Sequence, residues 1–248
     1  MKTLFLATAA VAAFAAAPAL AQSGPVGSIG ATYSASNIDF GPSSVDTDNV
    51  ILDGVVAVPA FSGWTATFAG AADYNTDSDD TLASGTAHLT RMAGSDIRFG
   101  GFVGAADLGG DTAYSAGVEA QKYLDKATLT GTVAYTTADK SNADVWTVGG
   151  DAAFYVQPNL RLNAGVSYSS VDAGPTLDLW TYGVGAEYEI SDTPFSVVAG
   201  FTRGDVEDLT IDTWNIGLRY SFGGGLQARD RAGAALPATG INSILSGL

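Results

Sequence analysis

Apolar residues alternate with polar or small residues along nearly the whole chain, in segments of about 9–11 residues. The segment 127–135 shows the pattern, because Leu129, Val133 and Tyr135 share one face while threonines occupy most of the other. Side chains of a β-strand point alternately to its two faces, so this period of two predicts strands with one apolar and one polar face. A length of about ten residues is what a tilted strand needs to cross the hydrocarbon layer of a membrane.

About twelve such segments follow one another along the chain. They are expected at 26–36, 50–58, 64–74, 85–92, 97–106, 112–123, 127–136, 146–156, 160–170, 180–190, 195–203 and 211–222. The connections after the odd-numbered segments, such as 37–49 and 75–84, are expected to be longer and more acidic than the others. An open sheet edge in lipid would leave backbone groups unpaired. We therefore expect an all-β fold, a closed antiparallel transmembrane β-barrel of about 12 strands, with 10–12 strands compatible with the pattern.

Aromatic residues lie near both ends of these segments on the apolar face. Trp146 and Trp180 are near one end, and Trp64, Phe154 and Tyr188 are near the other. Amphipathic rings are favoured where hydrocarbon meets headgroups, so two such belts indicate a membrane around the barrel. The alternative is a soluble β-sandwich, but its strands usually have about 5–6 residues and its apolar faces are buried.

Residues 1–21 have the layout of a cleavable secretory signal peptide. Lys2 supplies a positive charge, the run from Leu4 to Pro18 is uncharged, and Ala19-Leu20-Ala21 is a small-x-small cleavage site. The alternative is an N-terminal membrane anchor, but the run is short for a spanning helix. The barrel domain is then expected within 22–222, with a tail at 223–248.

The charge of the chain excludes some function classes. The formal net charge is −15, which disfavours nucleic acid as a partner. The chain has no cysteine, so disulfides and thiol chemistry are excluded. No motif for a cofactor is present.

The segment at the end of the expected barrel carries a specific pattern. Asn215, Gly217, Tyr220 and Phe222 form a polar-x-Gly-x-x-aromatic-x-aromatic sequence. In this respect the chain resembles Gram-negative outer-membrane β-barrel proteins of the broad porin-like group, over about 25–222. The resemblance implies integration into the outer membrane, contact with its lipid and lipopolysaccharide, and recognition of the last strand by the outer-membrane assembly machinery.

The inward face of the expected barrel carries a few charged and polar side chains. By strand parity these are Asp53, Arg98, Glu119, Gln121, Asp151, Arg161, Glu187, Glu189 and Arg219. We expect Arg161 to face Glu187, and Arg98 to face Glu119 or Gln121, because opposite charges across strands attract. Either these side chains form a constriction that selects small hydrophilic solutes, or they are ion-paired filler in a closed barrel.

Catalysis and metal binding receive little support from the sequence. The single histidine, His88, is expected to face the lumen without a recognisable nucleophile motif beside it, so the chain is not expected to be an enzyme. A weak calcium candidate is the spacing of Asp73, Asn75, Asp77 and Asp79. Ser78 and Ser84 stand where that pattern requires Gly and Glu.

The segment 223–248 follows the expected last strand and would lie in the periplasm. Ile241, Ile244, Leu245 and Leu248 have the spacing of one helix face. The tail is expected to be either flexible or a short helix that docks into the periplasmic mouth or onto a partner. The function expected for the whole is passive, porin-like passage of small hydrophilic solutes. The alternative is a closed structural or interaction barrel with acidic outer loops and no transport activity.

Overall fold

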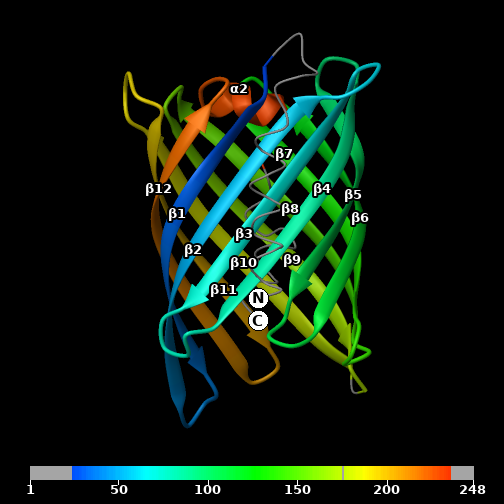
Figure 1. Ribbon diagram of the computed structural model, residues 1–248, viewed down its shortest axis with the longest axis vertical. Coiled ribbons are helices and arrows are strands. Elements are labelled where there is room, and N and C mark those ends of the chain that lie inside the picture. Colours follow the sequence, from blue (N-terminus) through cyan, green and yellow to red (C-terminus); the bar gives the residue numbers. More distant parts are fainter. Residues whose placement is uncertain (1–23, 175, 236–248) are drawn as a thin grey trace.

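The computed structural model describes residues 24–174 and 176–235, and these form a closed antiparallel β-barrel (Figure 1). Its elements are β1 (Val26–Asp39), β2 (Ser44–Pro59), β3 (Trp64–Asn75), β4 (Thr81–Ala93), β5 (Ile97–Asp107), β6 (Thr112–Tyr123), β7 (Ala127–Ala138), β8 (Asp144–Gln157), β9 (Leu160–Asp172), β10 (Thr176–Glu189), β11 (Phe195–Val206), β12 (Leu209–Phe222) and α2 (Leu226–Arg231). Each strand pairs with its sequence neighbours, and β1 pairs with β12. The predicted twelve-stranded barrel is therefore confirmed.

The two faces of the wall have opposite character. On β12, Trp214, Ile216 and Leu218 point outward and are 65%, 58% and 61% exposed. Threonine and serine dominate the buried positions that face inward. An apolar outer surface and a polar interior are what a barrel needs in lipid. The alternation in the sequence therefore predicts the face of most side chains, while apolar residues such as Phe102 and Leu179 also occupy buried inward positions.

Aromatic rings pair across neighbouring strands on the outer surface. Tyr135 and Trp146 have ring centroids 5.2 Å apart, and Tyr168 and Trp180 are 5.1 Å apart. Trp64 lies at the opposite end of the wall, with the Arg91 guanidinium 5.5 Å from its ring. Rings of this kind stabilise a barrel at the membrane interfaces.

The expectation of longer connections after odd-numbered strands is wrong. The connection between β1 and β2 spans only 40–43, and that between β3 and β4 spans 76–80. The acidic residues expected in loops continue the strands instead: Asp46 pairs with Asn37 in register, and the Asn37 Nδ2 group donates to the Asp46 carboxylate at 2.7 Å. Backbone pairing with a neighbouring strand has overridden the low strand propensity of Asp and Asn.

The chain turns back over the barrel directly after β12. Gly223 and Gly224 have φ angles of +85° and +145°, a conformation that only glycine adopts without strain. A Cβ at Gly223 would also lie 2.8 Å from the Pro25 carbonyl oxygen. The turn places α2 across one mouth of the barrel, at the top of Figure 1. This rim, with the turns that follow the even-numbered strands, is called the α2 end below.

The helix α2 has six residues, and no helix in the described part of the chain has the length and apolar character that crossing a membrane requires. Leu226 is buried against Ala153 and Tyr155 of β8. The residues of the predicted helix face at 241–248 lie outside the described residues.

Candidate functional site

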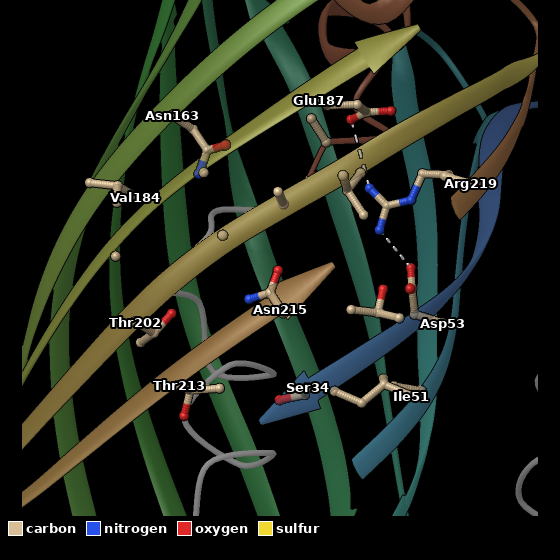
Figure 2. Close-up of a pocket in the computed structure, with 18 of the residues that line it drawn as sticks. Ser34, Ile51, Asp53, Asn163, Val184, Glu187, Thr202, Thr213, Asn215 and Arg219 are labelled. Carbon is tan, nitrogen blue, oxygen red and sulfur yellow. Dashed lines mark hydrogen bonds and ion pairs between the residues drawn. The ribbon is translucent and has the colours of Figure 1, made fainter. Parts of the chain in front are cut away.

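A band of alternating charges crosses the lumen near the α2 end. Glu187 on β10 is at its centre, and its Oε2 atom lies 3.8 Å from both Arg161 and Arg219. Arg219 also pairs with Asp53, with Nη2 2.9 Å from Oδ2 (Figure 2). The predicted cross-strand contact between Arg161 and Glu187 is present, and the two residues are direct partners in register.

The pair of Asp53 and Arg219 depends on a glycine in the strand between them. Asp53 on β2 and Arg219 on β12 both pair with Gly30 of β1. A Cβ at Gly30 would lie 2.7 Å from the Asp53 Oδ1 atom and 3.3 Å from Arg219 Nε. The missing side chain therefore lets the carboxylate and the guanidinium meet across β1. This link spans the seam where the two ends of the barrel join.

The helix α2 contributes a further cation that the sequence reasoning missed. Arg229 places Nη2 3.1 Å from Glu187 Oε1 and Nη1 3.6 Å from Glu189 Oε2. The available signal was the charged run Arg229-Asp230-Arg231 directly after the barrel, opposite two expected glutamates of β10. The band, called the charged band below, consists of Asp53, Arg161, Glu187, Glu189, Arg219 and Arg229.

Further contacts hold the α2 segment, residues 226–235, in the mouth. The Tyr155 hydroxyl donates to the Asp230 carboxylate at 2.5 Å, and the Thr67 hydroxyl donates to the Gly233 carbonyl at 2.8 Å. Gln227 donates from Nε2 to the Asp125 carbonyl at 2.7 Å. These anchors come from β8, from β3 and from a rim turn, so the segment is fixed on several sides of the mouth.

Arg98 supports the same segment from β5. It donates to the Tyr123 hydroxyl at 2.9 Å, the Thr90 hydroxyl at 3.0 Å and the Arg231 carbonyl at 2.8 Å. Gln121 is its register partner, as one of the two expected pairings requires, and accepts a hydrogen bond from Tyr123 at 2.9 Å.

Arg98 therefore faces Gln121, and the other alternative, Glu119, pairs elsewhere. Glu119 Oε1 lies 2.8 Å from His88 Nδ1, and His88 Nε2 lies 3.0 Å from the Thr86 hydroxyl. The register sets Gly100 opposite Glu119, which moves the carboxylate away from Arg98. The order hydroxyl, imidazole, carboxylate is that of a catalytic triad, but His88 and Thr86 are buried beside the lumen wall. We read these three side chains as a link between β4 and β6.

A cavity of about 440 Å³ occupies the lumen beside the charged band. Its wall comes from β1 to β3 and β9 to β12, with α2 at one end. Neutral polar side chains line it away from the band: Ser34, Asn163, Thr181, Thr202, Thr213 and Asn215. Four of the lumen residues expected from the sequence line this cavity: Asp53, Arg161, Glu187 and Arg219. Glu189 is connected to this group by its ion pair with Arg229.

The remaining expected lumen residues belong to the opposite wall. Arg98 and Gln121 are 5% and 7% exposed there, and Asp151 on β8 is also buried at 7%. Glu119 is held by His88. The predicted lumen set therefore divides into residues that line the cavity and residues whose side chains are largely buried in the opposite wall.

The predicted calcium ligands do not converge. Asn75 Oδ1 accepts the backbone N–H groups of Asp77 and Ser78, both at 2.9 Å. Asp77 accepts the N–H of Asp48, while Asp79 accepts the Tyr74 hydroxyl. Asp73 is buried in the wall of β3. Within 24–174 and 176–235, no group of three or more His, Asp or Glu side chains is placed to hold a metal ion.

The terminal-strand residues lie at the seam between β12 and β1. Asn215 and Gly217 point to the lumen, and Tyr220 points outward. Phe222, the last residue of β12, pairs with Gly27, where a Cβ would lie 2.8 Å from the Phe222 ring. Recognition of these residues by assembly machinery stays a prediction.

Closure, the apolar outer surface and the polar lumen define the class: an integral β-barrel membrane protein. Residues 6–222 match the family described as "Outer membrane protein beta-barrel domain". The chain belongs to this family and is an outer-membrane β-barrel protein.

Solved structures with the same architecture include channels, at low sequence identity. An outer membrane channel from Pseudomonas putida F1 has a TM-score of 0.58 at 12% identity, covering 84% of this chain and 98% of that one. The NanC porin has a TM-score of 0.58 at 9% identity, covering 77% and 100%. The KdgM porin, in complex with disordered oligogalacturonate, has a TM-score of 0.55 at 12% identity, covering 79% and 99%. These likenesses show the fold. No curated protein matches the chain.

Proposed function

We propose that this protein is a passive channel for small hydrophilic solutes in the outer membrane. The observation that carries the proposal is the cavity of about 440 Å³ in the lumen, which is lined by neutral polar side chains together with apolar ones and adjoins the charged band. Two porins and an outer membrane channel share this fold, which supports the proposal.

The charged band gives the channel little preference for one sign of charge. It contains three carboxylates, Asp53, Glu187 and Glu189, and three guanidinium groups, Arg161, Arg219 and Arg229. Charged rings select ions when one sign dominates, and here the two signs balance. The channel is therefore suited to small neutral solutes and to salts with weak selectivity.

The experiment is ion conductance of the refolded protein in a planar lipid bilayer. Insertion should produce discrete current steps in potassium chloride, with a reversal potential near zero in a salt gradient. Boiled protein serves as the control for detergent artefacts. No current at any voltage, from protein shown to be folded, would refute the channel.

A closed barrel is the second candidate, and the position of α2 favours it. The α2 segment lies in one mouth of the barrel and is anchored to β3, β5, β8 and β10. In that case the barrel would present its acidic hairpin tips outside the cell and carry no solute. A chain lacking the α2 segment distinguishes a channel plugged by α2 from a barrel whose lumen is filled throughout.

An even strand number returns the chain to its starting side, so β1 begins and β12 ends at the same rim. We place the α2 end in the periplasm and the acidic hairpin tips outside the cell. Removal of a signal peptide at 1–21 and delivery to the assembly machinery through β12 belong to the same proposal.

A further inference from the structure

Two asparagines face the cavity across a pair of glycines. Asn163 on β9 pairs with Gly185 on β10, Gly185 pairs with Gly200 on β11, and Gly200 pairs with Asn215 on β12. The four residues thus form one row across the wall, and all four line the cavity. In Figure 2 both carboxamides lie over the wall on either side of β10 and β11.

The glycines make room for the carboxamides. A Cβ at Gly185 would lie 3.0 Å from Asn163 Oδ1 and 3.1 Å from its Nδ2. A Cβ at Gly200 would lie 3.0 Å from both polar atoms of Asn215. Each carboxamide therefore leans across the neighbouring glycine, and the wall between the two asparagines carries no side chain. The result is a shallow neutral strip with a carboxamide at each end.

Neither carboxamide is hydrogen-bonded to another group within the described part of the chain, and both are half-buried at the cavity. Asn49 and Asn75 continue the same row through Ser34, and they provide a contrast. The Asn75 Nδ2 group donates to Asn49 Oδ1 at 3.0 Å, so those two carboxamides are joined to each other. A carboxamide has two N–H donors and an acceptor oxygen, and at Asn163 and Asn215 these face the solute path.

The chemistry of this strip fits hydroxyl groups. A hydroxyl both donates and accepts, as a carboxamide does, and neither carries a charge. Three strand spacings of about 4.8 Å, or about 14 Å along the curved wall, separate the two Cα positions. Each carboxamide lies over its neighbouring glycine, and Gly185 and Gly200 are register partners about one strand spacing apart, so the two polar groups approach each other. Two carboxamides at this spacing suit neighbouring hydroxyl groups of one sugar ring.

We propose that Asn163 and Asn215, the asparagine pair, form a binding station for neutral solutes that carry several hydroxyl groups, such as monosaccharides and disaccharides. This inference rests on the proposed function, because the station lies on the solute path of the channel. It adds to the proposed channel the class of solute that is bound and the two residues that contact this solute. The charged band supplies the boundary of the station at the α2 end, with its own charges already paired.

Equilibrium binding tests the station without requiring conduction. The refolded barrel, in a detergent without a sugar headgroup, is titrated with maltose and followed by saturation-transfer NMR. Asn163→Leu keeps the size of the side chain and removes its polar atoms, and should weaken binding roughly 3- to 10-fold, the loss of one or two neutral hydrogen bonds. Asn215→Leu should do the same. Asn37→Leu, at an outer hairpin, is the matched control and should leave the affinity unchanged.

If Asn215→Leu fails to assemble, the Asn163→Leu variant alone provides the test, because Asn163 lies on β9, away from the terminal strand. Unchanged maltose affinity in folded Asn163→Leu, or no maltose binding by the parent protein, would overturn the inference.

Flux separates this inference from the channel itself. In a liposome-swelling assay, the parent protein should admit maltose and a methyl-capped polyethylene glycol of matched size, which has no O–H donors. Asn163→Leu should change the maltose rate and leave the glycol rate alone. Equal effects on both solutes would reject the station while leaving the channel in place. The two proposals can therefore fail separately. Ion current without maltose binding would reject the station and keep the channel, whereas maltose binding without ion current would reject the channel.

Discussion

Glu187 holds the charged band together. It is 5% exposed, and its Oε1 atom accepts the Ser196 hydroxyl at 2.8 Å while pairing with Arg229 at 3.1 Å. A carboxylate so far out of water is stable only with several partners, and removal of one partner from a buried pair is costly. Its Oε2 atom faces Arg161 and Arg219, so one side chain balances cations from β9, β12 and α2.

Glu187→Gln should shift the ion preference of the channel. The substitution keeps the shape and a hydrogen-bond acceptor but leaves three guanidinium groups facing two carboxylates, so chloride permeability should rise severalfold relative to potassium. The destabilisation should be about 1–3 kcal/mol, below the range for fully buried pairs because Arg219 stays partly hydrated. The reversal potential in a potassium chloride gradient measures the shift, with Glu207→Gln at an outer turn as the control. An unmoved reversal potential would contradict the role given to the band.

Asp111 ties two outer turns together. The turn between β5 and β6 carries its carboxylate, which accepts the N–H groups of Ser141 at 2.9 Å and Lys140 at 2.8 Å from the turn between β7 and β8. These hydrogen bonds lower the pKa of the Asp111 carboxyl from 3.8 to about 2, and the bond from the Ser141 N–H has the largest effect. Hydrogen bonds to the ionised form stabilise it, which explains the direction.

The link through Asp111 should therefore persist to low pH. A carboxyl whose pKa is depressed on folding stabilises the folded state above its ordinary pKa, and the contribution is lost as the pH falls through the folded value. The turns at 108–111 and 139–143 should stay joined at pH 4 and separate as the pH falls through about 2. NMR titration of the Ser141 amide gives the midpoint, and Asp111→Asn should abolish the transition. A midpoint near 3.8 would disprove the clamp.

At the scale of elements, α2 is a short helix held in place by its surroundings. A helix of six residues is not stable alone in water, so its order depends on the anchors from the barrel. Leu226 supplies an apolar contact, and Arg229 and Asp230 supply the polar ones. The segment is therefore the part of the described structure most easily displaced without opening the sheet.

Deleting 226–248 should raise the single-channel conductance severalfold, because the segment occupies a mouth of the lumen. Deleting only 236–248 is the matched control, since it retains α2 and its anchors, and the increase should be smaller or absent. Heat-modifiable gel mobility verifies that both shortened chains fold. An unchanged conductance after the longer deletion would show that α2 does not limit flow. No current from either chain would favour the closed barrel.

At the scale of the whole molecule, the barrel should have one orientation in the outer membrane. The chain has no cysteine, so single cysteines can be placed at either rim without background. Ser43, in the turn after β1, and Lys126, at the α2 end, are both exposed. Ser43→Cys should react with a membrane-impermeant maleimide on intact cells, whereas Lys126→Cys should react only after permeabilisation. The reverse pattern would overturn the proposed sidedness.

Most of the wall could be predicted from local sequence. The alternation that separates Leu129 from Thr130 depends on neighbouring residues alone, and it predicts both the strands and the side that each residue faces. Hairpin neighbours are also close in sequence, so the register of Arg161 with Glu187 followed from the same pattern. The true lengths of the outer hairpins could not be predicted from this pattern, because their Asp-rich ends are held in strands by pairing with adjacent chain segments.

The lumen required the tertiary structure. Asp53 and Arg219 meet only because the barrel closes between β1 and β12, the strands farthest apart in sequence, and because Gly30 lies between them. Arg229 reaches Glu187 only because the chain folds back at Gly223. The sequence by itself therefore determined a membrane barrel of about twelve strands with a polar interior, since a period of two is a local property. Which polar groups meet inside was decided by closure and register, since these set distances between residues that the chain does not bring together locally.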